Sequence, residues 1–386
     1  MKSLCRNLLA SLLLLIGTVG TAYCQEPDDK TLLIRQLPRD NLLLFQDEQG
    51  TQSPVRSLED WSRRRNSILR GMQSVMGDLP GSEKTCELDV AVEEETDCGS
   101  FVRQSISYQS ELGSRTPAYL LTPKSALSSE TSGNKPPRHP AVLCLHPTHV
   151  RGPDGIVGRI PNVDNQYGRE LAERGYVVIA PNYPHLGKYQ PDLKTFGWKS
   201  GTLKAVWDNK RALDLLDSLP YVQPGKYAAI GHSLGGHNSV YTAVFDDRLQ
   251  VIISSCGLDS YVDYYNGNPA VWKPGQGWTQ ERYMPRLALY AGRLEEIPFD
   301  FHEMIGALAP RHTLIIAPQR DGNFRAESVD SIVAAARPIF ELYKTANRLQ
   351  VEHPPVNHEF PSEMRERAYQ LIDSVLKQSN TPAETR

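Results

Sequence analysis

The sequence predicts an α/β fold with a mostly parallel central sheet, antiparallel N-terminal strands and helices on both faces. Two observations predict it. From residue 140 onward, unbroken apolar runs of strand length alternate with amphipathic helical segments, as in parallel sheets that are covered on both faces: AVLCLH, YVVIAP, YAAIGH, VIISSC and TLIIAP. Before residue 125, three segments read instead as antiparallel strands that enter the sheet: CELDVAV, FVRQSISYQS and TPAYLLTPK.

The bulk composition agrees with a large soluble domain. The chain has 386 residues, of which 40% are hydrophobic and 23% are charged, so there is enough apolar material for a sizeable core. The formal net charge of −3 supplies no electrostatic reason to bind nucleic acid or an anionic membrane. We therefore expect no nucleic-acid partner.

The first 24 residues predict a signal peptide. Lys2 and Arg6 precede an apolar stretch that runs to Val19, and small residues follow near Ala22. The apolar stretch is too short for a stable membrane span, so we expect cleavage near Ala22 to Cys24. The mature protein is then exported, to the periplasm or beyond, with no stable membrane insertion.

The remaining elements follow in order. Residues 25–80 are predicted to form an N-terminal extension ending in a helix that Ser57 caps. Residues 81–378 are predicted to form the catalytic domain, with a lid-like insertion at 258–298 after the sixth strand and a frayed tail at 379–386. The segments between and after the apolar runs predict helices, with LQVEH as a last strand: GRELAERG, LKAVWDNKRALDLLDSL, HNSVYTAVFDD, DSIVAAARPIFELYKTA and SEMRERAYQLIDSVLKQ.

The cysteines allow one disulfide and suggest no metal. Cys86 and Cys98 flank LDVAVEEETD, which resembles a hairpin, and they are either bridged or two free thiols. Cys144 and Cys256 lie in apolar runs and are predicted to be buried, inert thiols. The sequence has no C-x-x-C pair or other ligand spacing typical of zinc, and we expect neither a metal nor an organic cofactor.

The segment GHSLGG places Ser233 between glycines where the strand YAAIG gives way to a helix. Gly-rich strand-to-helix turns are common, so the pattern alone also fits an ordinary turn. It also fits a nucleophile elbow, in which a serine is held at a strained backbone position and its neighbours two residues away must be small. Ser233 is our candidate nucleophile.

The partners of a serine nucleophile are expected at later strand ends, because open parallel sheets carry their working groups at the carboxyl ends of strands. Asp321 follows TLIIAP and His358 follows LQVEH. His358 would act as the base, and Asp321 would hold its tautomer. Asp259, after VIISSC, is an alternative acid.

The developing oxyanion of an acyl-transfer reaction needs hydrogen-bond donors. We expect one from the backbone N–H of Leu234, directly after the nucleophile. The second is expected from the loop after AVLCLH, where Pro147 has no N–H and Thr148 is the candidate. The alternative is that HPTH is only a tight turn.

With these residues in place the sequence resembles the α/β-hydrolase superfamily, and more narrowly its exported bacterial acetyl xylan esterase-like or dienelactone hydrolase-like branch. The resemblance covers about residues 57–376 and implies Ser233 as nucleophile, Asp321 as acid and His358 as base, in that chain order. It departs from the family at Pro147, where such proteins often have glycine. It rests on these segments: WSRRRNSILRGM, YLLTP, LHPTH, KAVWDNKRALDLLDSLP, GHSLGGHNS, RYMPRL, ALAPRHTLIIAPQRDGNF and NHEFPSEMRERAY.

The predicted insertion is rich in Tyr and Trp. Tyr261, Tyr264, Trp272 and Trp278 are candidates to stack on sugar rings, although most such aromatics pack an insertion onto its domain. Arg151, in the loop after AVLCLH, is a candidate contact for an anionic substrate, and the alternative is a solvated loop charge.

These observations predict a secreted serine hydrolase that cleaves a carboxylic ester on a carbohydrate, with a small-molecule or polysaccharide ester as its partner. Two alternatives stay open. One is an ungated peptidase of the prolyl-oligopeptidase type, and the other is a catalytically silent exported binding protein that keeps the fold.

Overall fold

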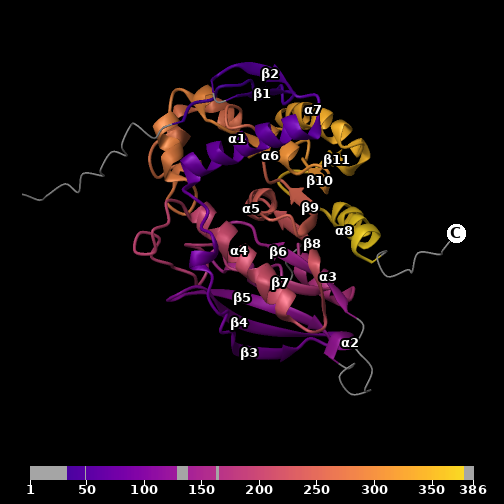
Figure 1. Ribbon diagram of the computed structural model, residues 1–386. Helices are drawn as coiled ribbons and strands as arrows, with labels where there is room; N and C mark the ends of the chain where they lie inside the picture. Colours follow the sequence, from indigo (N-terminus) through magenta and orange to yellow (C-terminus); the bar gives the residue numbers. More distant parts are fainter. Residues whose placement is uncertain (1–32, 48, 128–137, 162–164, 378–386) are drawn as a thin grey trace, which may run out of the picture. The chain divides into compact units, whose positions relative to one another are not determined.

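The computed structural model describes residues 33–47, 49–127, 138–161 and 165–377 (Figure 1). The predicted signal peptide and the tail 379–386 lie outside these ranges. The chain divides into Met1–Leu32 and Leu33–Arg386, and everything below concerns the second unit. None of the helices in the described ranges is long and apolar enough to cross a membrane.

The described residues form a nine-stranded sheet in the order β11-β10-β9-β8-β6-β7-β5-β4-β3. Strands β6 to β11 are parallel, and β5, β4 and β3 join antiparallel at one edge. The predicted mostly parallel sheet with antiparallel N-terminal strands is confirmed. The strands are β3 (Ala91–Asp97), β4 (Phe101–Glu111), β5 (Ser114–Pro123), β6 (His139–Leu145), β7 (Val177–Pro181), β8 (Val222–His232), β9 (Leu249–Ser255), β10 (His312–Ile316) and β11 (Leu349–Glu352).

The first edge strand begins later than the sequence predicted. CELDVAV was expected to be a strand, but β3 spans Ala91–Asp97 and forms a hairpin with β4. Six of its seven residues are exposed and four are acidic, so no apolar pattern marked its start, and charge on an edge strand discourages pairing with other chains. Cys86 and Cys98 are free thiols in the structure, and their sulfurs bond to separate carbonyls, of Gln109 and Thr96.

Helices cover both faces of the parallel strands (Figure 1). On one face, α3 and α8 pack against apolar side chains of β6 to β10, including Val142, Ile230 and Ile253. On the other, α4 and α5 pack against each other and against β8. The helices are α1 (Leu58–Met76), α2 (Lys124–Leu127), α3 (Tyr167–Glu173), α4 (Gly201–Ser218), α5 (Leu234–Phe245), α6 (Phe301–Ala307), α7 (Ala326–Leu342) and α8 (Ser362–Leu376).

The segment 258–298, which follows β9, has no regular strand or α-helix; it is a chain of short 3₁₀ helices. Counted from β4, β9 is the sixth strand, as predicted for the start of this insertion. The 3₁₀ helices are η5 (Tyr264–Gly267), η6 (Pro269–Trp272), η7 (Gly277–Thr279), η8 (Pro285–Tyr290) and η9 (Leu294–Glu296). Elsewhere the structure has η2 (Ser82–Lys84), η4 (Gly152–Asp154), η10 (Ala346–Arg348) and the small hairpin of β1 (Leu44–Gln46) and β2 (Gln52–Pro54).

Buried ion pairs hold α1 and the residues before it against α6. Asp300 caps α6, and Glu303 accepts a 2.7 Å hydrogen bond from the Asp300 N–H in return. Glu303 is 1% exposed and receives Arg35 at 2.5 Å and Arg64 at 2.9 Å. Arg39 pairs with the buried Asp300. The segment before α1 and the helix α1 itself are therefore both held by ion pairs to α6 and its cap, directly after the insertion.

Replacing Glu303 by alanine should destabilise the protein by about 3–5 kcal/mol, because two buried guanidinium groups lose their shared carboxylate. Glu59→Ala, which breaks an exposed pair with Arg63 on α1, is the matched control and should cost less than about 1 kcal/mol. Chemical denaturation of both variants measures the difference. Equal losses would contradict a structural role for the buried cluster.

Candidate active site

Ser233 lies at the junction of β8 and α5 in a strained conformation. Its backbone has φ 54° and ψ −122°, which a non-glycine residue adopts only when its surroundings enforce it. The Ser233 N–H donates to the carbonyl of Ser255 at the end of β9 (2.8 Å), and its carbonyl accepts from the N–H of His237 (3.0 Å). The serine is thus held between a strand end and the first turn of a helix, as predicted for a nucleophile elbow.

The glycines of GHSLGG are required by the close approach of neighbouring backbone. A Cβ on Gly235 would lie 1.9 Å from the carbonyl oxygen of Leu145 at the end of β6, and a Cβ on Gly231 would lie 2.2 Å from the Gly235 carbonyl group. No side chain fits at either position. The first turn of α5 therefore lies directly against the strand that leads into the predicted oxyanion loop.

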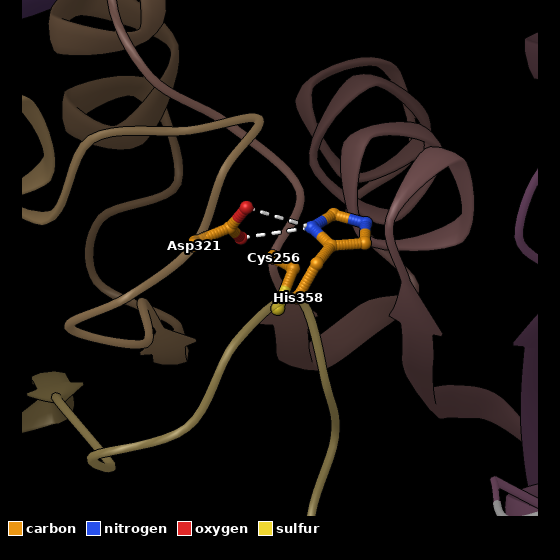
Figure 2. Close-up of side chains that lie close together, drawn as sticks. All are labelled: Cys256, Asp321 and His358. Atoms are coloured by element: carbon orange, nitrogen blue, oxygen red, sulfur yellow. Dashed lines mark hydrogen bonds and ion pairs between the residues drawn. The ribbon is translucent and has the colours of Figure 1, made fainter.

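His358 and Asp321 lie in contact at the same edge of the sheet (Figure 2). The His358 Nδ1 atom is 2.9 Å and 2.8 Å from the two carboxylate oxygens of Asp321. An ionised carboxylate only accepts hydrogen bonds, so Nδ1 carries the proton and Nε2 is left as the basic nitrogen. Figure 2 shows that second nitrogen on the side of the ring away from Asp321.

Asp321 is held as a carboxylate. Burial raises its pKa, but hydrogen bonds from His358 and from the N–H groups of Asn323 (2.8 Å) and Phe324 (3.3 Å) outweigh burial, and the pKa is lowered overall. The side chain of Asp321 is 2% exposed and that of His358 is 25% exposed. A charged acid that orients a partly accessible imidazole is the arrangement that general-base chemistry needs.

Asp259, the alternative acid, lies apart from this pair. It is 2% exposed, and its carboxylate accepts one long hydrogen bond, from the N–H of Arg325 at 3.4 Å. Burial raises the pKa of Asp259 to about 8, so this group is mostly protonated at neutral pH. The geometry and the charge state both favour Asp321.

The two predicted oxyanion donors flank the same cavity as Ser233. Leu234 is the first residue of α5, and the N–H groups of a first helical turn have no partner within the helix. Thr148 follows Pro147, and its hydroxyl lies 3.2 Å from that of Tyr283. His146 fixes this loop, because its ring bonds to the Pro147 carbonyl (2.7 Å) and accepts from the Tyr183 N–H (3.0 Å).

His232, immediately before the serine, is a neutral neighbour of the pair. Burial, followed by the nearby His358, lowers its pKa to about 3, and its Nδ1 lies 3.2 Å from the Ser255 hydroxyl. The rings of His232 and His358 are 5.0 Å apart between centroids. An uncharged imidazole at this position adds no positive charge beside His358.

Ser233 and His358 line one cavity of about 530 Å³, together with the two candidate oxyanion donors. Among the residues that the structure describes, the lining contains no Lys, Arg, Asp or Glu, and these residues present hydroxyls, amides and aromatic rings to a ligand. The lining residues are Pro147, Thr148, Asn165, His232, Ser233, Leu234, Tyr264, Tyr265, Gly277, Trp278, Gln280, Tyr283, Asn323, Phe324 and His358.

Only some of the predicted contact residues reach this cavity. Tyr264 and Trp278 line it, whereas Tyr261 and Trp272 are fully buried in the packing of the insertion. Arg151 pairs with Asp154 and lines a separate cavity. The aromatic insertion that the sequence singled out also supplies Tyr265 and Tyr283 to the lining, whereas sequence reasoning missed Phe324, Gln280, Asn165 and Asn323.

Trp278 is a fixed part of the cavity wall. It stacks on His237 of α5, with centroids 4.2 Å apart and an interplanar angle of 10°, and it lies near-parallel to Phe324 at 6.4 Å. Phe324 in turn lies 5.9 Å from the His358 ring. The insertion and the loop after β10 therefore form one aromatic surface beside the candidate base.

Three potential metal ligands lie together in the described part of the chain. The sulfur of Cys256, an oxygen of Asp321 and a ring nitrogen of His358 are all within 4.8 Å of one another. Two of these groups are already joined by the His358–Asp321 hydrogen bond, which a metal would have to displace. We therefore interpret the cluster as a hydrogen-bonded Asp321–His358 pair with a neighbouring thiol, Cys256.

The family model described as "Glucuronyl esterase, fungi" matches residues 194–343 of the chain. The protein YtaP of Bacillus subtilis (strain 168), named as a hydrolase, is 24% identical over 326 residues, which are 82% of this chain and 99% of that protein. The 4-O-methyl-glucuronoyl methylesterase of Phanerochaete carnosa (strain HHB-10118-sp) is 23% identical over 88% of this chain and 81% of its own length.

Solved structures share the fold. A glucuronoyl esterase from Solibacter usitatus superimposes with a TM-score of 0.65 at 17% identity, over 88% of this chain and 98% of that one. A Bacteroides fragilis protein described as an acetyl xylan esterase has a TM-score of 0.53 at 14% identity, over 77% and 76% of the two chains. These likenesses show that the chain has the α/β-hydrolase fold, as the sequence predicted. The matched family and relatives indicate a carboxylic ester hydrolase, also as predicted.

Gly235→Ala should abolish folding or destabilise the protein by more than about 3 kcal/mol, because the new Cβ meets the Leu145 carbonyl oxygen, which a strand holds in place. Gly322→Ala is the matched control, since a Cβ there meets nothing within 4 Å. Thermal unfolding of the two variants checks the difference. A well-folded Gly235→Ala protein would contradict the described elbow.

The buried Asp259 should make stability fall as the pH rises. The folded protein keeps a proton on Asp259 up to about pH 8, whereas an unfolded chain releases it near about pH 4, so the folded state binds more protons between these values. Asp259→Asn should remove part of the stability loss between pH 6 and pH 8.5, on the order of 1–3 kcal/mol. Denaturation midpoints at both pH values measure it, with the exposed Asp78→Asn as control. An unchanged pH dependence would show that Asp259 ionises normally.

Proposed function

We propose that the protein is an exported serine esterase that cleaves a carboxylic ester on a carbohydrate, with Ser233 as nucleophile, His358 as base and Asp321 as acid. The observation that carries this proposal is the hydrogen bond from His358 Nδ1–H to Asp321 beside a cavity that Ser233 also lines. We further propose that residues 1–24 direct export and that 258–298 covers the site as a lid.

The proposed reaction has two halves. Ser233 Oγ attacks the ester carbonyl carbon while His358 Nε2 takes the hydroxyl proton, and the N–H groups of Leu234 and Thr148 stabilise the oxyanion. The bond to the leaving alcohol breaks as His358 returns the proton to that oxygen. Water then loses a proton to His358, attacks the acyl-enzyme and releases the carboxylic acid and free Ser233.

The chemistry of the cavity supports a neutral sugar ester. The described lining residues include no Lys or Arg to pair with a free carboxylate, whereas an esterified uronic acid or an acetylated sugar carries no charge. Aromatic rings and amide groups together are typical of carbohydrate sites, where rings cover the apolar faces of sugars and amides bond to hydroxyls. The names of the similar proteins, glucuronoyl and acetyl xylan esterases, support the same substrate class.

A fluorophosphonate probe should label the wild-type protein, and Ser233→Ala should abolish the label, because the probe reacts only with an activated serine. Hydrolysis of a methyl glucuronate ester, acetylated xylan and methylated pectin, followed in parallel, then identifies the ester. A wild-type protein that neither takes the label nor cleaves p-nitrophenyl acetate would overturn the enzyme assignment and favour a silent binding protein.

The acid can be assigned with two matched variants. Asp321→Asn should lower kcat by about 10³-fold or more, since the neutral amide neither fixes the His358 tautomer nor stabilises its cation. Asp259→Asn should change kcat by less than about tenfold, because that group is buried, mostly protonated and out of contact with His358. The opposite ranking would assign the acid to Asp259.

A further inference from the structure

A buried thiol lies against the acid and base of the proposed site. Cys256 is 2% exposed and follows directly after β9, and the sequence predicted it only as an inert core residue. Its backbone has φ 49°, and its N–H donates to the Ile316 carbonyl at the end of β10 (2.8 Å). Side chains along a strand alternate between its two faces, and this conformation breaks that pattern at Cys256. The sulfur lies beside Asp321 and His358 (Figure 2).

The thiol bonds to the loop that carries the base. Cys256 Sγ lies 3.4 Å from the backbone carbonyl oxygen of Glu359, the residue after His358. Burial, and then the negative charge of Asp321, raise the pKa of the thiol, so it keeps its proton and acts as a donor. The Ser255 hydroxyl donates to the sulfur at 3.8 Å. The S–H group therefore links the end of β9 to the backbone of the His358 loop.

The carboxylate of Asp321 lies between several hydrogen-bond donors and the sulfur of Cys256. Oδ1 accepts from His358, Asn323 and Phe324, Oδ2 accepts from His358, and the carboxylate also has a side-chain hydrogen bond with Cys256. The sulfur, a carboxylate oxygen and the ring nitrogen are mutually within 4.8 Å, so the thiol lies directly beside the pair. Removing the Cys256 thiol would leave a gap beside His358 and would leave the Glu359 carbonyl without the thiol donor.

We propose that Cys256 is a positioning residue of the hydrolase: its S–H donates to the Glu359 carbonyl and thereby holds the His358 imidazole on Asp321 with Nε2 free to face Ser233. This role rests on the proposed function of the triad. It requires no thiolate and no change of redox state, and it explains why a strained backbone conformation occurs at a residue that does not line the cavity.

Cys256→Ala should lower kcat about tenfold with KM unchanged, because the loss of one hydrogen bond loosens the base and not the substrate cavity. Cys256→Ser keeps a donor on a shorter side chain and should stay within about threefold of the wild type. Cys144→Ala is the matched control. It removes an equally buried thiol from β6 and should cost stability without changing kcat. Steady-state hydrolysis of p-nitrophenyl acetate measures all three.

A second readout does not depend on activity. The Nδ1–H proton of His358, bonded to a carboxylate, should give a downfield proton NMR signal that moves in Cys256→Ala, moves less in Cys256→Ser and stays unchanged in Cys144→Ala. If Cys256→Ala does not fold, Cys256→Val, which also lacks a donor, takes its place, and an unchanged signal in that variant overturns the proposal.

The two proposals fail in different ways. An inactive wild-type protein whose His358 signal still moves in the Cys256 variants would overturn the esterase assignment but not the positioning role. An active protein whose kcat and signal are the same in the wild type and Cys256→Ala would overturn the positioning role alone.

Discussion

The close contact between the first turn of α5 and the end of β6 is the constraint on which the site depends. Gly235 leaves no space for a side chain against the Leu145 carbonyl, and Ser233 is held at a positive φ by its bond to the Ser255 carbonyl. That packing brings the N–H of Leu234, the Thr148 loop and the Ser233 hydroxyl to one cavity. The sheet then adds the other partners, because β10 and β11 end at the same edge.

The strand ends also determine the electrostatics. The side chains of the two aspartates that follow β9 and β10 are both buried. Several hydrogen bonds stabilise the negative charge of Asp321, whereas one long hydrogen bond from a backbone N–H reaches the carboxyl group of Asp259. The neutral His232 and Cys256 lie beside His358 without adding charge. Among the described residues, Asp321 is thus the carboxylate that hydrogen-bonds to the imidazole, and the uncharged side chains described in the cavity lining agree with the uncharged ester that we propose.

The sequence predicted the sheet, most helices and the order of Ser233, Asp321 and His358, because unbroken apolar runs and strand ends are local signals. Side-chain direction in the 258–298 segment could not be predicted, because 3₁₀ turns have no long periodicity: Trp278 reaches the cavity and Trp272 is buried. The start of β3 was misplaced because an exposed acidic edge strand has no apolar pattern. The contact of Cys256 with Glu359 depends on a positive φ, which the letters VIISSC do not reveal.

The central claim is that three distant side chains converge on one ester carbonyl. A crystal structure of the fluorophosphonate adduct tests it most directly. The account predicts phosphorus on Ser233 Oγ, a phosphoryl oxygen within hydrogen-bond distance of the Leu234 and Thr148 N–H groups, and His358 Nε2 about 2.6–3.2 Å from an adduct oxygen. Phosphorus on another residue, or a His358 ring turned away from the adduct while Asp321 stays in place, would contradict it.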